Sequence, residues 1–130
     1  MEGGYRTPLA RARGLGAAGH GVGHWISERL SSLALVPLVL WVIYAGLQLA
    51  GAGYDGALAW VRHPLNAVLL ALLLAVSFQH MHAGMRVVVE DYIHKTATKA
   101  VLLIFNLFVC VLFGALAVFA VLKVALSGAL

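Results

Sequence analysis

Three long stretches of this sequence carry no formally charged residue, and each is long enough to cross a lipid bilayer. The first covers residues 30–54, the second runs from Pro64 to Met85, and the third lies between Lys99 and Lys123. A membrane-spanning helix needs about 20 consecutive apolar residues. Inside a bilayer each stretch must be helical, because only a helix or a closed barrel satisfies every backbone hydrogen bond without water. The pattern therefore predicts an all-α integral membrane protein with three transmembrane helices.

The composition favours lipid over water as the solvent of this chain. Hydrophobic residues make up 62% of the 130 residues and charged residues only 11%, whereas a soluble domain carries about 25% charged residues. The net charge of +4 is distributed around the apolar stretches and forms no basic patch with interleaved aromatics, so we expect no nucleic-acid partner. A single cysteine, Cys110, excludes a disulfide framework and is interpreted as a packing residue.

The chain divides into an arm and a membrane-anchor domain. Residues 1–23 hold seven of the 14 glycines and no apolar run, which predicts a flexible cytoplasmic arm rather than a signal peptide. Residues 24–130 form the anchor domain, with spans at approximately 30–52, 64–86 and 99–123. Three helices alone make a thin bundle, so we expect them to pack with the helices of a partner subunit.

Prolines and glycines indicate how the spans begin, bend and connect. Pro64 suits the first turn of the second helix, where its missing N–H costs little. Pro37 lies inside the first span and predicts a local kink, which membrane helices tolerate. Gly51, Gly53 and Gly56 mark the first connection.

The distribution of Lys and Arg predicts the orientation in the membrane, because cytoplasmic loops are enriched in these residues. Seven of them flank one side of the predicted spans and two flank the other: Arg6, Arg11, Arg13, Arg29, Arg86, Lys95 and Lys99 against Arg62 and Lys123. We therefore expect the N-terminus and the second connection in the cytoplasm and the C-terminus in the periplasm. The sequence contains no clear Ser/Arg-rich transit peptide, which favours a bacterial inner membrane.

The chemistry-bearing residues gather at the end of the second span, in the segment FQHMHAGMRVVVEDYIH, residues 78–94. At about 100° per residue, His80, Gly84, Val87 and Asp91 fall on one stripe of a helix. His82 points roughly 200° away from His80, so the two cannot grip one metal ion, which argues against zinc. A histidine with a glycine one turn away suits axial ligation of haem iron. A buried packing histidine and a helix-packing glycine are the alternatives.

Asp91 and Tyr92 follow His80 by about 16–18 Å along the same helix, near the membrane surface. A tyrosine hydroxyl there can donate a hydrogen bond to a carbonyl oxygen, and a carboxylate can hold an arginine or relay a proton. The alternative is an interfacial tyrosine beside a solvated acid.

The pattern His80-x3-Gly84-x6-Asp91-Tyr92 on the second of three spans resembles the D-type hydrophobic membrane-anchor subunits of succinate dehydrogenase, respiratory complex II. The segment GVGHWISERLSSLALVPL, residues 21–38, adds to the resemblance, which extends over roughly residues 21–126. It implies that His80 is one axial ligand of haem b, and that Arg29 lies near the haem propionates. It also implies that Tyr92 hydrogen-bonds the ubiquinone headgroup while Asp91 orients that site.

The same resemblance implies the partners. A C-type cytochrome b anchor subunit would give the second haem ligand, and an iron–sulfur subunit and a flavoprotein subunit would carry the clusters and FAD. The chain would have no catalytic residue acting alone. Three alternatives stay open: the anchor of a quinol:fumarate reductase, a small proton-conducting membrane protein using His80 and Asp91, and a non-catalytic assembly subunit.

Overall fold

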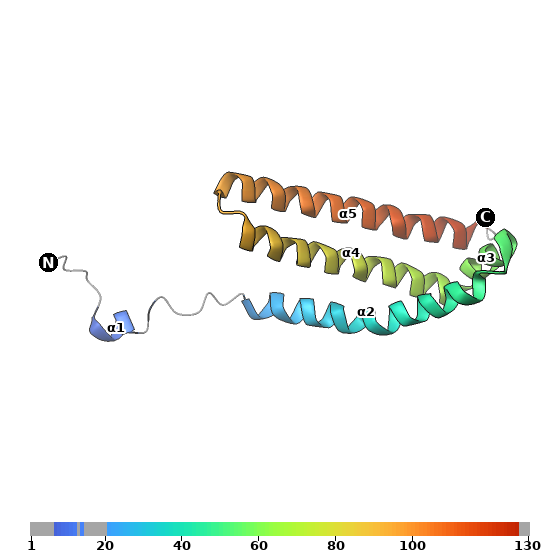
Figure 1. The fold of residues 1–130 in the computed structure, drawn as a ribbon, viewed down its shortest axis with the longest axis horizontal. Coiled ribbons are helices and arrows are strands. Elements are labelled where there is room, and N and C mark those ends of the chain that lie inside the picture. Colours follow the sequence, from blue (N-terminus) through green and yellow to red (C-terminus); the bar gives the residue numbers. More distant parts are fainter. Residues whose placement is uncertain (1–6, 13, 15–20, 128–130) are drawn as a thin grey trace.

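The structure, a computed structural model, describes residues 7–12, 14 and 21–127 and is helical almost throughout (Figure 1). It contains a short helix followed by four longer ones: α1 Pro8–Ala12, α2 Gly21–Leu49, α3 Gly53–Arg62, α4 Pro64–Tyr92 and α5 Thr96–Leu126. No strand occurs in these residues, so the predicted all-α class is confirmed. Most of the arm expected at residues 1–23, with Arg6 and Arg13, lies outside the described residues.

Three of the helices are long and apolar enough to cross a bilayer: Val22–Leu49, Pro64–Tyr92 and Thr96–Leu126. They confirm that the chain has three helices able to span a membrane. Each helix extends past its apolar stretch at one end at least, whereas α2 ends at Leu49, within the first stretch. The backbone keeps its helical hydrogen bonds when the chain leaves the hydrocarbon, so polar residues of the interface extend the same helix. As a result α4 carries His80, Asp91 and Tyr92 on one continuous helix.

The first connection is itself largely helical, which the three glycines did not indicate. Gly53 adopts φ +64°, a left-handed conformation that favours glycine, and α3 starts there. Asp55 in the first turn and Arg62 in the last turn each suit the helix dipole. The Trp60 ring stacks on Trp41 of α2, with centroids 5.4 Å apart, which packs the connection against the first span.

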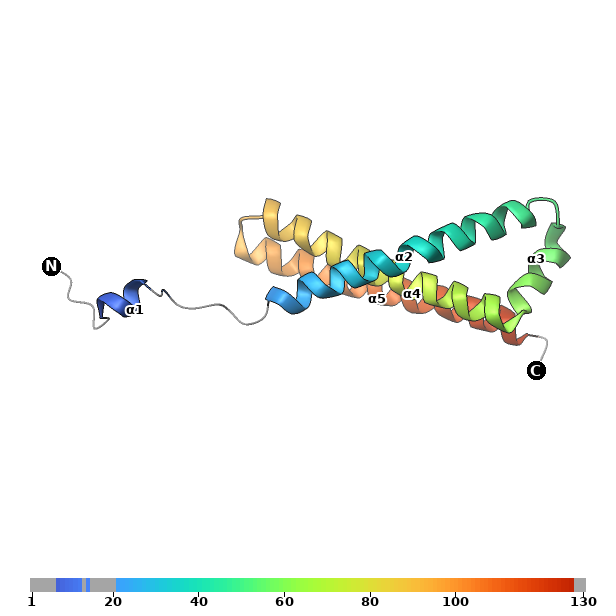
Figure 2. The same cartoon turned by 90° about the horizontal axis from the view of Figure 1, so that it is seen from below.

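Helix α4 is the centre of the fold, because it packs against both α5 and α2 (Figure 1). In the described part of the chain α2 and α5 share no contact, so the helices form an incomplete bundle. Figure 2 shows α2 crossing the α4–α5 pair obliquely, so that its second half diverges from α4. Pro37 does not interrupt α2, which remains one helix over 29 residues and curves along its length in Figure 1.

This arrangement buries few side chains. The buried apolar residues are small or medium in size and are scattered along the helices: Leu38, Ala45, Ala67, Leu73, Val89, Cys110 and Val121. Cys110 is buried and free, as its interpretation as a packing residue requires. Large apolar side chains remain exposed along all three long helices, which fits immersion in lipid and leaves faces for other helices.

The contact between α4 and α5 depends on Gly114, and this yields a test of the fold. A Cβ at Gly114 would lie 3.2 Å from both Cβ and Cγ of Phe78 on α4. We expect Gly114→Leu to destabilise the chain by about 1–3 kcal/mol, because a bulky side chain forces the two helices apart. The midpoint of chemical denaturation of the full chain in a mild detergent measures this.

Gly46→Leu is the matched control, since nothing lies within 4 Å of a Cβ at Gly46. It makes the same chemical change on α2 and should leave the midpoint near that of the wild type. Equal effects of the two substitutions would contradict the packing of α4 on α5.

Candidate functional site

A groove of about 330 Å³ lies between the first half of α2 and the second half of α4. Four of its seven lining residues come from α2 and three from α4: Trp25, Glu28, Arg29, Ser32, His80, Gly84 and Val87. The predicted stripe of His80, Gly84 and Val87 therefore does face one common space. The groove also takes in Arg29, which the sequence resemblance placed beside the same cofactor.

His80 is held by a hydrogen bond to the neighbouring helix. Its Nδ1 lies 3.0 Å from Oγ of Ser31, the one buried polar side chain among the described residues. The Ser31 hydroxyl donates its own proton to the backbone carbonyl of Glu28, 3.0 Å away. With that proton directed to the carbonyl, the serine oxygen can accept a hydrogen bond from Nδ1–H of His80, and in this tautomer Nε2 carries the lone pair that a metal ligand needs.

Gly84 keeps the groove open beside His80. Nothing lies within 4 Å of the position that a Cβ would occupy there. A packing glycine is instead found on α5, at Gly114, where the Cβ position is crowded by Phe78. Within this chain the helix-packing alternative for Gly84 has no contact to support it, and the bare backbone is consistent with the approach of a flat cofactor.

Arg29 stands at the rim of the groove with its guanidinium carbon 5.4 Å from the centroid of the Trp25 ring. This cation–π contact holds a positive charge at the end of the apolar span. Trp25 and Glu28 were not singled out as site residues in the sequence, because their place in the groove depends on how α2 crosses α4.

Asp91 and Tyr92 are the last two residues of α4 and do not line the groove. Both side chains are exposed, and that of Tyr92 is 76% exposed. His94 Nδ1 approaches the backbone carbonyl of Tyr92 at 3.2 Å and does not engage the phenol. The structure brings His80 and Arg29 together in the groove and leaves Asp91 and Tyr92 together at the helix end, outside it.

A polar cluster between these two places was missed at the sequence level. Arg86 donates from Nε to Oε1 of Glu90 and from Nη1 to Nε2 of His24 on α2, both at 2.7 Å. Lys99 of α5 donates to the backbone carbonyl of Glu90 at 2.9 Å. The Arg86–Glu90 spacing of four residues was a visible signal, but the contact with His24 requires the α2–α4 crossing. The cluster links the ends of three helices.

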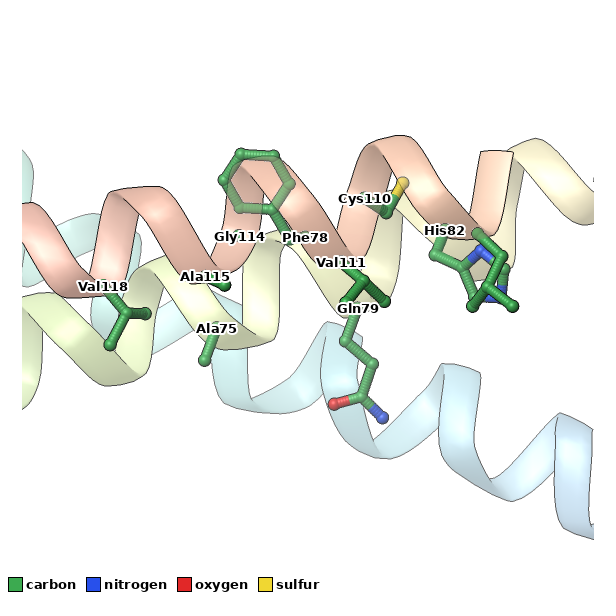
Figure 3. A pocket seen from close by; sticks show the side chains of 10 residues that line it. Ala75, Phe78, Gln79, His82, Cys110, Val111, Gly114, Ala115 and Val118 are labelled. Carbon is green, nitrogen blue, oxygen red and sulfur yellow. The ribbon is translucent and has the colours of Figure 1, made fainter. Parts of the chain in front are cut away.

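His82 faces the opposite side of α4, as the helix angle predicted. It lines a second, larger cavity of about 430 Å³ between α4 and α5, whose other lining residues are mostly apolar (Figure 3). Asn106 of α5 donates from Nδ2 to both Nδ1 and the backbone carbonyl of His82, each at 3.0 Å. Accepting at Nδ1 places the proton of neutral His82 on Nε2, which removes the lone pair that a metal would need. This cavity contains none of the residues predicted for haem or quinone.

The comparisons with known proteins agree with this architecture. The family model described as succinate dehydrogenase/fumarate reductase transmembrane subunit matches residues 4–125. The chain is 29% identical over 103 residues to the succinate dehydrogenase hydrophobic membrane anchor subunit of Rickettsia conorii, covering 77% of this chain and 82% of that protein. No solved structure matched.

Two further relatives are also succinate dehydrogenase hydrophobic membrane anchor subunits. The protein from Rickettsia felis is 30% identical over 102 residues, covering 77% of this chain and 81% of its own length. The protein from Paracoccus denitrificans is 29% identical over 99 residues, covering 76% of this chain and 77% of its own. With a family match over residues 4–125 and three apolar helices, this chain belongs to the succinate dehydrogenase/fumarate reductase transmembrane subunits, as a hydrophobic membrane anchor of the succinate dehydrogenase type.

Proposed function

We propose that this chain anchors a succinate:quinone oxidoreductase, that His80 is an axial ligand of haem b, and that Asp91 and Tyr92 form part of the ubiquinone-reduction site. The observation that carries the haem assignment is the groove in which His80, oriented by Ser31, stands beside bare Gly84. The names of the relatives favour succinate oxidation over fumarate reduction as the working direction.

The residues of the groove fit haem b in shape and in charge. Gly84 leaves the backbone free for close approach of a flat macrocycle, and Arg29 offers a cation to its propionates. When bound, the haem supplies an iron centre that accepts and returns one electron. What this chain contributes is the position of the imidazole, the bare backbone at Gly84 and a polar rim with Arg29.

The groove is open on one side, and we expect a partner subunit to cover that side. A C-type cytochrome b anchor subunit would close it and provide the second axial ligand, and the exposed apolar faces of α2, α4 and α5 offer the surface for its helices. The iron–sulfur subunit would dock at the end that carries Tyr92, with the flavoprotein subunit behind it. FAD and the iron–sulfur clusters belong to those two subunits.

Quinone reduction would take place at the end of α4. Ubiquinone gains two electrons from the iron–sulfur subunit and two protons from the cytoplasmic side. The Tyr92 hydroxyl donates a hydrogen bond to a quinone oxygen as negative charge develops on it. Asp91 orients this site, through an arginine of the partner anchor or by relaying a proton. Because succinate is oxidised in the flavoprotein, this chain has no catalytic activity alone.

The His80 assignment is tested by the reduced-minus-oxidised visible spectrum of the purified complex. We expect His80→Ala to lose the b-type haem signal, because no other residue of the groove offers a nitrogen lone pair to iron. His82→Ala is the matched control and should retain the signal, since His82 faces α5. Loss of the haem signal in His82→Ala with retention in His80→Ala would refute the assignment.

Tyr92→Phe tests the quinone site. We expect succinate:ubiquinone activity to fall roughly 10- to 100-fold, because a hydrogen bond to a charged oxygen contributes about 1.5–3 kcal/mol. Succinate oxidation by a soluble dye that takes electrons from the flavoprotein should stay at the wild-type rate. Tyr54→Phe, at the α3 end of the molecule, is the control. Unchanged ubiquinone activity in Tyr92→Phe would exclude the tyrosine from the site.

Orientation is tested with single cysteines in a Cys110→Ala background. We expect Thr96→Cys, at the start of α5, to react with an impermeant thiol reagent only from the cytoplasmic side. Ser127→Cys, at the end of α5, should react only from the periplasmic side. The reverse pattern would invert the proposed topology.

A further inference from the structure

Ser31 combines two properties that are unusual for a residue inside an apolar span. Its side chain is 7% exposed, so its hydroxyl is withdrawn from water and from lipid. A buried hydroxyl is costly unless both its donor and its acceptor capacities are used. Here one hydrogen bond goes to the Glu28 carbonyl and the other joins Nδ1 of His80, each at 3.0 Å.

The proposed role of His80 gives the second bond its direction. A ring that binds iron through Nε2 carries its proton on Nδ1, so Nδ1 donates to the Ser31 oxygen. The Ser31 hydroxyl then directs its single proton to the Glu28 carbonyl, the other group within hydrogen-bond distance. The partner that matches this tautomer of His80 lies 49 positions away in the sequence.

We infer that Ser31 is a positioning residue for the haem ligand: its Oγ accepts the Nδ1–H of His80, orients the ring and makes Nε2 a stronger donor to iron. This inference rests on the proposed function, in which His80 binds haem. Histidines that bind metals commonly donate their second ring N–H to a fixed acceptor, and that partner tunes both the affinity and the electronic properties of the metal.

The inference predicts the direction in which the midpoint potential of the haem changes when Ser31 is replaced. An imidazole that donates through Nδ1–H carries more electron density at Nε2 and stabilises ferric over ferrous iron. Removing the acceptor should therefore raise the midpoint potential of the haem and weaken its retention, typically by about 10- to 100-fold in metal affinity for a lost outer-shell partner. A serine that only joined α2 to α4 would leave the haem potential unchanged.

Ser27 provides a matched control one turn earlier on α2. Its Oγ accepts a hydrogen bond from Nε2 of Gln79 on α4 at 3.5 Å, and Ser27 does not line the groove. Ser31→Ala and Ser27→Ala thus each remove a hydroxyl that joins α2 to α4, and only the first removes the contact with the ligand. Ser31→Thr keeps a hydroxyl at the position and serves as the conservative rescue.

The experiment uses the whole purified complex, with haem content per flavin, redox titration of the haem and its low-spin electron paramagnetic resonance signal as readouts. We expect Ser31→Ala to raise the midpoint potential, shift the resonance signal and increase haem loss. Ser27→Ala and Ser31→Thr should match the wild type. If Ser31→Ala does not assemble, Ser31→Cys replaces it, because a thiol of similar size is a weak acceptor.

The outcomes separate this inference from the function on which it rests. Loss of haem in His80→Ala, with the same haem potential and resonance signal in Ser31→Ala as in Ser27→Ala, would overturn the role of Ser31 alone. Failure of Ser31→Thr to restore the Ser31→Ala defect would also overturn it. Retention of the haem signal in His80→Ala would overturn His80 as the proposed ligand, and the role of Ser31 with it.

Discussion

The requirement that every backbone polar group find a partner inside the bilayer governs this structure. It turns each uncharged stretch into a helix and leaves side chains as the only means of making contacts between helices. Since lipid is as apolar as leucine, close packing and interhelical hydrogen bonds replace the hydrophobic effect as the source of helix association. Close packing and interhelical hydrogen bonds both occur here, but between different pairs of helices. Gly114 lets α5 approach Phe78 of α4, whereas α2 meets α4 through polar contacts such as Ser31 with His80.

The two faces of α4 are therefore built differently, and this difference separates its two histidines. On the α5 side, Asn106 holds His82 by donating to its Nδ1, so that the ring presents an N–H. On the α2 side, His80 pairs with a hydroxyl, which can accept its Nδ1–H and leave the lone pair on Nε2, as the proposed haem binding requires. The two histidines of the HMH triplet thus have partners of different hydrogen-bonding character. The chemistry proposed for His80 follows from the acceptor on α2 as much as from the histidine.

The oblique crossing of α2 explains why the site is open. Because α2 contacts α4 and makes no contact with α5 among the described residues, the groove between α2 and α4 has no third wall. The exposed faces of these helices are apolar, and Arg29 and Trp25 form a polar and aromatic rim at one end. The proposed sharing of a flat cofactor with a partner subunit requires a groove that is open on one side, since a closed groove would exclude the partner.

The sequence alone determined the three spans, the stripe of His80, Gly84 and Val87, and the opposite direction of His82, because charge spacing and helical periodicity are local properties. It also contained the resemblance that the family match confirmed. The tertiary structure decided that Trp25 and Glu28 line the groove and that Ser31 pairs with His80. Both depend on which residues of α2 meet which residues of α4, and no periodicity within one helix contains the crossing angle of two. Helix α3 was likewise seen only in the structure. The separation of Asp91 and Tyr92 from the groove has a simpler cause, since a continuous helix carries them beyond its end.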